Sequence, residues 1–206
     1  DIAQLRADVQ ALEEELLRLQ ASALDQEGSS VRQFIGDGQR QYLSGMFLGG
    51  QRILVLMDSS ASMLDNTLVN IIRTRNMDDD RKRNAPKWQR VVKTVDWIST
   101  QLPVTSRYQV WHFNQDHSSV LEGTTETWLE VADRDQLNQV IAGAEQVVPQ
   151  NGTNLQQVFR AASNMNPRPD NIFLITDGLP TLGARESRDN LITPNRRMEL
   201  FEEAVE

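Results

Sequence analysis

The sequence predicts an α/β fold in which a doubly wound, mostly parallel, Rossmann-like sheet carries helices on both faces. Short apolar runs of strand length alternate with longer segments whose apolar residues recur at helical spacing, and this alternation is typical of parallel sheets. The most apolar run, residues 53–57, has no polar residue at any position, as expected for a strand buried on both faces. Polar residues follow the predicted strand ends, where such sheets bind their ligands.

Length, composition and charge limit the classes of protein. A chain of 206 residues with 39% hydrophobic residues suits one globular domain plus an appendage. Its 21 Lys and Arg against 29 Asp and Glu give a net charge of −8, which opposes nonspecific attraction to nucleic acid or anionic lipid. The lack of cysteine excludes disulfides and thiolate metal sites. No apolar run of about 18 residues occurs, so any membrane anchor would lie outside the printed sequence.

Residues 1–27 are predicted to form a coiled-coil helix that acts as a stalk. Apolar side chains recur there in alternating steps of three and four, as heptad a and d positions do. They are Ile2, Leu5, Val9, Leu12, Leu16 and Leu19. The seam is narrow and flanked by charged residues, which favours self-association over the alternative, an amphipathic helix lying on its own domain. Residues 28–50 are predicted to be a linker and lead-in, because Gly28, Ser29 and Ser30 break the helix.

Residues 51–206 form the predicted sheet domain. After the first strand, the dense mixed charge at residues 78–83 predicts a solvated loop over residues 64–85. An apolar stripe at residues 88–98 predicts a helix that begins after Asn84 as N-cap, with Pro86 in its first turn. The remaining predictions are a strand at 108–113, an edge strand or hairpin around 120–131, helices around 137–147, 155–162 and 196–205, and another buried strand at 172–175.

Three separated segments place oxygen-bearing side chains after strands of this sheet. Residues 58–62 have the pattern D-x-S-x-S directly after the first strand, and residues 176–178, Thr-Asp-Gly, follow the last identifiable strand. The turn at residues 151–154 opens a helix, so Thr153 can present its hydroxyl near the same edge. Each residue alone could be a helix cap or a turn residue. Together they favour a divalent cation, because hydroxyl and carboxylate oxygens are hard ligands.

These residues resemble the metal-ion-dependent adhesion site (MIDAS) of the von Willebrand factor A (VWA) domain family, which joins D-x-S-x-S to a distant threonine and a distant aspartate. The matching positions are Asp58, Ser60, Ser62, Thr153 and Asp177. The resemblance implies a VWA fold over residues 51–206 and a bound Mg²⁺, with Mn²⁺ or Ca²⁺ as alternatives. It implies that Ser60 and Ser62 bind the metal directly. Thr153 and Asp177 would bind it directly or through water, and Asp58 would act largely through water.

The resemblance further implies a protein-binding module in which an Asp or Glu carboxylate of a partner completes the coordination of the metal. The general style of the sequence resembles bacterial VWA proteins with an N-terminal anchor and a coiled coil. This favours a membrane-tethered protein of the periplasm or cell envelope over a cytoplasmic one. Two alternatives stay open, a structural scaffold with a non-essential metal loop and a metal-dependent phosphate hydrolase with Asp58 as nucleophile. No nucleotide-binding or serine-hydrolase motif occurs, so we expect no catalytic residue.

The sequence departs from the family pattern in two places. The family continues after the strand at 172–175 through one or two further parallel strands. We therefore expect a C-terminally incomplete sheet with an unprotected edge, or its completion by a neighbouring chain. The insertion at residues 64–85 is longer than the family pattern, and we expect it to rim the binding face. His112 and His117 lack a recognised metal-ligand spacing and are expected to be structural or exposed.

Overall fold

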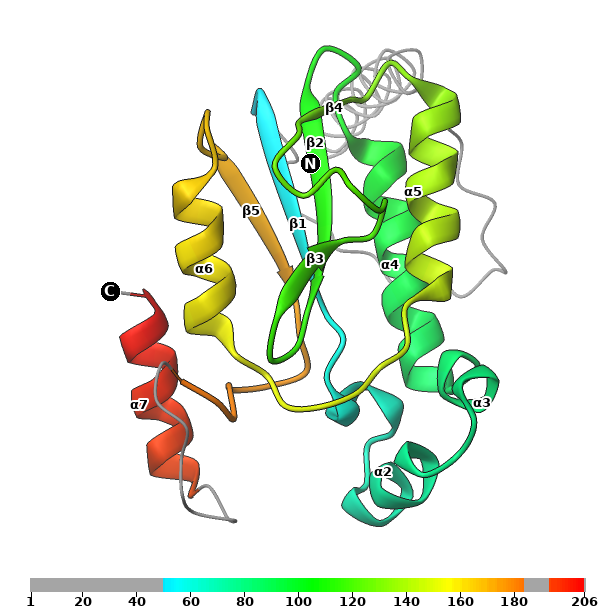
Figure 1. Cartoon of the computed structure of the whole chain (residues 1–206), viewed down its shortest axis with the longest axis vertical. Helices are drawn as coiled ribbons and strands as arrows, with labels where there is room; N and C mark the ends of the chain where they lie inside the picture. The colour runs from blue at the N-terminus through cyan, green and yellow to red at the C-terminus, as the bar shows by residue number, and fades with distance from the viewer. Residues whose placement is uncertain (1–49, 184–192, 206) are drawn as a thin grey trace, which may run out of the picture.

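The computed structural model describes residues 50–183 and 193–205 (Figure 1). The predicted coiled coil at residues 1–27 lies outside the described residues, as does all of the predicted linker except Gly50. The elements are β1 (Arg52–Asp58), the 3-10 helix η1 (Ala61–Leu64), α2 (Leu68–Arg75), α3 (Asp79–Arg83), α4 (Pro86–Gln101), β2 (Arg107–Phe113), β3 (His117–Ser119), β4 (Leu129–Glu130), α5 (Arg134–Gln146), α6 (Leu155–Asn164), β5 (Asn171–Ile175) and α7 (Pro194–Val205). None of the helices in this part of the chain is long and apolar enough to cross a membrane.

The sheet is mixed, and its parallel part lies at the centre. The strand order is β3-β2-β1-β5, and β4 also pairs with β2. β1 pairs in parallel with β2 on one side and with β5 on the other. The segment predicted as an edge strand or hairpin forms β3 and β4, which both run antiparallel to β2. The structure therefore confirms an α/β fold with a parallel centre and places short antiparallel strands beside it.

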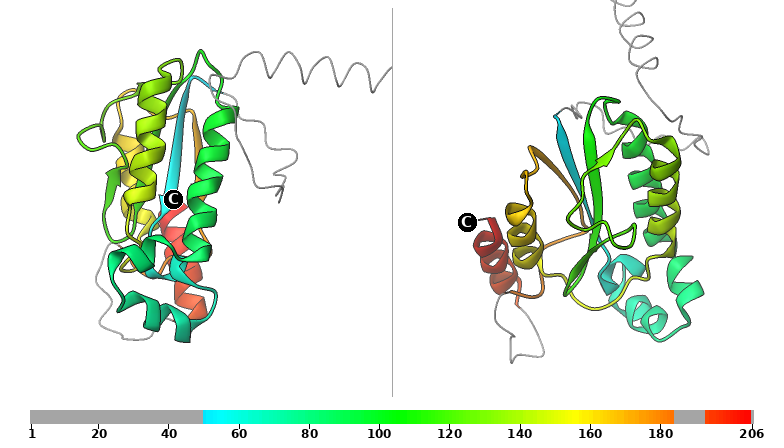
Figure 2. Two further views of the ribbon diagram at one scale, coloured as in Figure 1. Left: turned by 90° about the vertical axis from the view of Figure 1, so that its right-hand side faces the viewer. Right: turned by 45° about the horizontal axis from the view of Figure 1, so that its top comes forward.

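Helices cover both faces of the sheet, as the alternation of elements predicts. α4 and α5 lie on one side, and α6 and α7 lie on the other (Figure 2). Ile53, Val55 and Met57 of β1 share one core cluster with side chains of α4 and α5. Leu54 and Leu56 belong to a second cluster with side chains of α6. The alternation of β1 side chains between the two clusters explains why this strand is apolar at every interior position.

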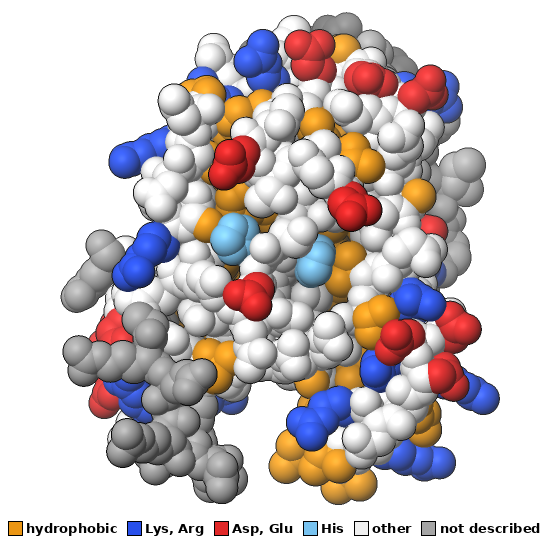
Figure 3. All heavy atoms as spheres, in the orientation of Figure 1, with side chains coloured by type: hydrophobic (Ala, Val, Ile, Leu, Met, Phe, Trp, Pro, Cys, Tyr) orange, Lys and Arg blue, Asp and Glu red, His pale blue; other side chains and the backbone are white. Residues whose placement is uncertain are grey.

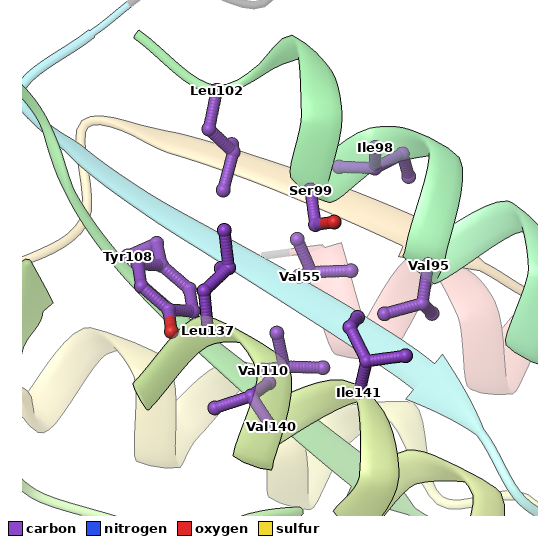
Figure 4. A pocket seen from close by; sticks show the side chains of 10 residues that line it. All are labelled: Val55, Val95, Ile98, Ser99, Leu102, Tyr108, Val110, Leu137, Val140 and Ile141. Carbon is purple, nitrogen blue, oxygen red and sulfur yellow. The ribbon is translucent and has the colours of Figure 1, made fainter. Parts of the chain in front are cut away.

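Helix α4 is built on the predicted apolar stripe. Pro86 occupies its first turn, but Ala85 is the N-cap, whereas Asn84 ends α3. Where α4 and α5 meet the sheet, side chains fill the interior so closely that no water molecule would fit (Figure 4). The lining residues are Val55, Val95, Ile98, Ser99, Leu102, Tyr108, Val110, Leu137, Val140 and Ile141. This region is therefore packed core and not a ligand cavity.

The charged segment after the first strand is not the loop that its composition predicts, because residues within it form α2 and α3. The Asp78 side chain accepts a hydrogen bond from the backbone N–H of Arg81 and caps α3. Two further aspartates pair with basic side chains three residues later in the same helix. The charges that suggested a loop therefore stabilise a helix, as an N-cap and as i,i+3 pairs.

Strand β5 is the terminal strand of the described sheet, and it is not the buried strand that its apolar sequence predicts. It pairs with β1, and no other strand of the described residues lies beyond it. Ile172 is 43% exposed, because one edge of β5 has no neighbouring strand there. This exposure matches the expected unprotected edge at this strand. α7 lies outside α6 and contributes Phe201 and Ala204 to the second core cluster.

Candidate metal centre

The carboxyl end of β1 brings a fully buried carboxylate to the edge of the sheet. Asp58 is the last residue of β1, and the flanking strands β2 and β5 exclude it from solvent. Its carboxylate accepts hydrogen bonds from the backbone N–H of Ser60 at 2.9 Å and from the Thr176 hydroxyl at 2.8 Å. The Thr153 hydroxyl donates a longer bond, 3.4 Å, to the same carboxylate. Asp58 therefore links three segments that are far apart in the sequence.

The environment of Asp58 favours a nearby cation. Burial raises the pKa of Asp58 above its ordinary value of 3.8, and the neighbouring charge of Asp177 adds to this effect. The hydrogen bonds from Ser60 and Thr176 oppose the shift because they stabilise the ionised form. A cation beside the carboxylate would stabilise the ionised form further.

A second group of oxygens adjoins Asp58. The hydroxyls of Ser60 and Ser62 lie 2.9 Å apart, and the Ser62 hydroxyl donates to Asp177 at 2.9 Å. Ser60 occupies the N-cap position of η1, but its side chain makes no capping hydrogen bond. The alternative role as a helix cap therefore does not account for the Ser60 hydroxyl. The structure brings together all five residues that the sequence selects, and it adds Thr176, the first residue of the Thr-Asp-Gly segment.

The turn that carries Thr153 is held against the loop after β1 by backbone hydrogen bonds. The N–H of Gln150 donates to the carbonyl of Ser59 at 2.8 Å, and the N–H of Ala61 donates to the carbonyl of Asn151 at 2.9 Å. Asn151 has a φ of 66°, a left-handed conformation that asparagine adopts more readily than most residues. This turn buries Thr153 with its hydroxyl directed to Asp58.

The segment after Asp177 packs closely on the same turn. The backbone N–H of Thr153 donates to the Thr181 hydroxyl at 2.9 Å, and the Thr153 carbonyl accepts from the N–H groups of Thr181 and Leu182. A Cβ atom at Gly152 would lie 2.8 Å from the Thr181 hydroxyl and 2.9 Å from a Leu182 methyl group. A larger residue at position 152 would therefore displace the side chains of Thr181 and Leu182, so glycine favours the close approach of the two segments.

A lysine that sequence reasoning missed completes the surroundings of Asp177. The Lys87 ammonium donates to the Asp177 carboxylate, to the Ser62 carbonyl at 2.9 Å and to the Asp65 carbonyl at 3.2 Å. Lys87 lies in the first turn of α4, well away in the sequence from the D-x-S-x-S segment. No spacing or motif in a single sequence indicates this contact.

The chemistry of the cluster is that of oxygen ligands. Among the described residues, no group of three or more His, Asp or Glu side chains could hold a metal ion, so a cation here would need the hydroxyls as well as the two carboxylates. The two histidines contact different side chains. His112 lies 3.3 Å from the Ser59 hydroxyl, and the ring of His117 lies 5.1 Å from that of Trp111.

Comparisons with known proteins give weak likenesses. No protein-family model matches the chain, and no curated protein matches it. Two solved structures of proximal thread matrix protein 1 from the mussel byssus are similar, each with 17% sequence identity and a TM-score of 0.43. One match covers 65% of this chain and 32% of that protein. The other, to the same protein "with zinc occupied MIDAS motif", covers 75% and 36%. The chain spans about a third of the length of these structures, and likeness at this level carries no conclusion about family.

Proposed function

We propose that this chain is a VWA-type protein-binding module whose MIDAS-like cluster holds Mg²⁺ and thereby captures a carboxylate of a protein partner. The observation that carries the proposal is the hydrogen-bonded cluster formed by Asp58, Ser60, Ser62, Thr153 and Asp177. These residues come from three separated segments. Local roles as caps or turn residues would not require the five side chains to meet.

The donor set fits a hard divalent cation. Mg²⁺ binds oxygen ligands in octahedral geometry and keeps several waters, and hydroxyls with two carboxylates supply such ligands. We propose that Ser60 and Ser62 bind the ion directly, that Thr153 and Asp177 bind it directly or through water, and that the buried Asp58 acts largely through water. Mn²⁺ and Ca²⁺ also accept oxygen ligands. When bound, the ion supplies a coordination position that an incoming carboxylate can occupy.

The charge balance favours an anionic partner group. Asp58 and Asp177 carry two negative charges, and Lys87 carries one positive charge beside them. A divalent cation would make this local group positive by one charge, although the chain as a whole has a net charge of −8. A localised positive charge of this kind attracts a carboxylate.

The phosphate-hydrolase alternative gains one supporting feature and meets one obstacle. Lys87 beside Asp177 is the kind of additional group that such a site requires. However, the Asp58 nucleophile of that mechanism is fully buried and accepts hydrogen bonds from Ser60, Thr153 and Thr176. An attacking carboxylate needs a free lone pair within reach of the substrate. The binding function therefore agrees better with the geometry.

The wider setting is proposed from the sequence alone. The predicted coiled coil at residues 1–27 would set the oligomeric state or the distance from a membrane, within an assembly of the bacterial periplasm or cell envelope. Self-association through this stalk and binding through the metal cluster are separate properties. Truncation of the stalk would change the first and leave the second intact.

A pull-down from the source organism tests the proposed function. The full chain is used as bait in Mg²⁺ and in EDTA, with Asp58→Ala as the variant. Ser59→Ala is the matched control, because the Ser59 hydroxyl donates to the Phe113 carbonyl inside the fold. We expect partners that bind the wild type and Ser59→Ala in Mg²⁺, and that are lost in EDTA and with Asp58→Ala. If neither EDTA nor Asp58→Ala changes the set of captured proteins, the result favours the scaffold alternative. Chelator-sensitive turnover of a phosphate ester would favour the hydrolase.

A further inference from the structure

Helix α2 presents apolar side chains to solvent. Leu68, Val69 and Ile72, here called the α2 face, are 70%, 77% and 52% exposed, and no residue of α2 is buried. Ile71 of the same helix is partly buried and packs against the core. Figure 3 shows hydrophobic side chains gathered over α2, with Lys and Arg side chains beside them. A contiguous apolar surface of this kind is typical of an interaction site.

The α2 face lies at the same edge of the molecule as the candidate metal centre. α2 follows η1 after three residues and packs against it (Figure 1). The Asp65 side chain accepts hydrogen bonds from the N–H and hydroxyl of Thr67, which fixes the start of α2. Lys87 binds the carbonyls of Ser62 and Asp65. One ammonium group therefore holds both the metal loop and the residues that lead into α2.

The charge around the α2 face is opposite to that of the whole chain. Residues 67–85 contain five basic and three acidic residues, whereas the chain has a net charge of −8. No ion pair involves Arg73, Arg75 or Arg81 within the part of the chain that the structure describes. These guanidinium groups favour an acidic partner segment. They oppose docking of this face on its own copy, because like charges would meet.

We propose that the α2 face and the metal centre bind one continuous segment of a partner protein, in which apolar side chains lie next to an acidic residue. The acidic side chain reaches the metal, the apolar side chains cover the α2 face, and further acidic groups meet the surrounding arginines. This inference rests on the proposed function, because the carboxylate is placed by the metal. It adds the class of partner sequence and the surface that selects it.

The test uses short random peptides displayed on phage and selected on the immobilised full chain in Mg²⁺. A selected peptide is then synthesised with a fluorescent label, and its affinity is measured by anisotropy. The variant carries Leu68→Ser, Val69→Ser and Ile72→Ser together. We expect the selected peptides to combine Asp or Glu with neighbouring apolar residues, and the triple variant to bind them at least about tenfold more weakly. Its affinity for Mg²⁺, measured by calorimetry, should equal that of the wild type.

The matched control is Met198→Ser, which removes an apolar side chain that is 47% exposed on α7 and should leave peptide binding unchanged. Unchanged peptide affinity in the triple variant would overturn the inference, as would a selection without Mg²⁺-dependent acidic peptides. Two further results would overturn it. One is binding of the wild type, but not of the triple variant, to anionic lipid vesicles. The other is a dimer in sedimentation analysis that the wild type forms and the triple variant does not. Peptide binding that survives Asp58→Ala contradicts the proposed function itself. If peptide binding requires the metal but is equally strong in the wild type and the triple variant, only the role of α2 is contradicted.

Discussion

The Lys87 ammonium donates a hydrogen bond to the Asp177 carboxylate and also binds the carbonyls of Ser62 and Asp65. One positive charge of the protein therefore neutralises one of the two carboxylates of the cluster. Because like charges repel, Lys87 should weaken the binding of a divalent cation and strengthen the attraction of the loaded site for a carboxylate.

Replacement of Lys87 by methionine tests this balance and keeps a side chain of similar length. We expect Lys87→Met to raise the Mg²⁺ affinity about tenfold, because a largely buried positive charge close to the ion is removed. Isothermal titration calorimetry measures this affinity directly. Lys93→Met, on the exposed side of the same helix, is the control and should change the affinity less than about twofold. A lower affinity in Lys87→Met would mean that the lysine organises the loop more than it repels the ion.

Ser59 and Ser62 belong to the same short segment but have different partners. The Ser59 hydroxyl donates to the Phe113 carbonyl at 3.0 Å, whereas the Ser62 hydroxyl donates to Asp177. Ser59→Ala should cost about 1 kcal/mol of unfolding free energy, the usual value for a lost internal hydrogen bond, and should leave Mg²⁺ binding unchanged. Ser62→Ala should weaken Mg²⁺ binding by at least about tenfold through loss of a ligand. Denaturant titration and calorimetry measure the two effects, and the reverse pattern would assign the metal to other residues.

Gly152 lies where the turn bearing Thr153 meets the segment after Asp177. A Cβ atom there would lie under 3 Å from Thr181 and Leu182, so Gly152→Ala should separate the two segments. We expect a loss of about 1–3 kcal/mol of stability, as for other overpacked sites, together with weaker Mg²⁺ binding. At Gly178 the nearest atom, on Arg197, would lie 3.6 Å from the new Cβ, which is an ordinary contact. Gly178→Ala is therefore the control. Equal tolerance of both changes would show that this contact does not position Thr153.

The two histidines predict a pH dependence of stability. Burial lowers the pKa of His112 and of His117 below the ordinary value of 6.5. The unfolded chain therefore binds protons more readily than the folded chain. The stability that the neutral histidines contribute is fully present above about pH 6.5 and is lost as the pH falls below it. Urea unfolding in EDTA at about pH 7.5 and about pH 5.5 should show the loss. The double variant His112→Asn, His117→Asn should lose less stability between these two pH values than the wild type. An equal loss in both proteins would assign the effect to other groups.

The elements that the sequence predicts well are those whose pattern depends on burial alone. β1 lies between two strands, and helices cover both of its faces. Its uninterrupted apolar run therefore correctly predicts a buried central strand. The short run at β5 looks the same in the sequence, yet Ile172 is exposed because β5 is at the edge. The order of strands, which decides this, is not encoded in a local pattern. Charge density at residues 78–83 likewise does not distinguish a loop from a short helix with i,i+3 pairs.

The sequence predicts those residues of the candidate metal centre that directly follow a strand. Parallel strands end at a common edge of the sheet, so Asp58 and Asp177 were expected at the same edge, and the pairing of β1 with β5 in the structure makes them neighbours. The approach of Lys87 depends on how α4 packs beside the loop, and the crowding at Gly152 depends on two loops in contact. Such contacts follow from tertiary packing, which periodicity and spacing do not describe.

The central claim is that five side chains from three segments hold a divalent cation. The most direct test is an anomalous difference map from a crystal of this chain soaked in Mn²⁺, a cation that takes the same oxygen ligands as Mg²⁺. We expect one strong peak about 2.0–2.3 Å from the hydroxyls of Ser60 and Ser62, with Thr153 and Asp177 beside it. The absence of a peak between these residues, or a peak there that persists in Asp58→Ala, would contradict the claim.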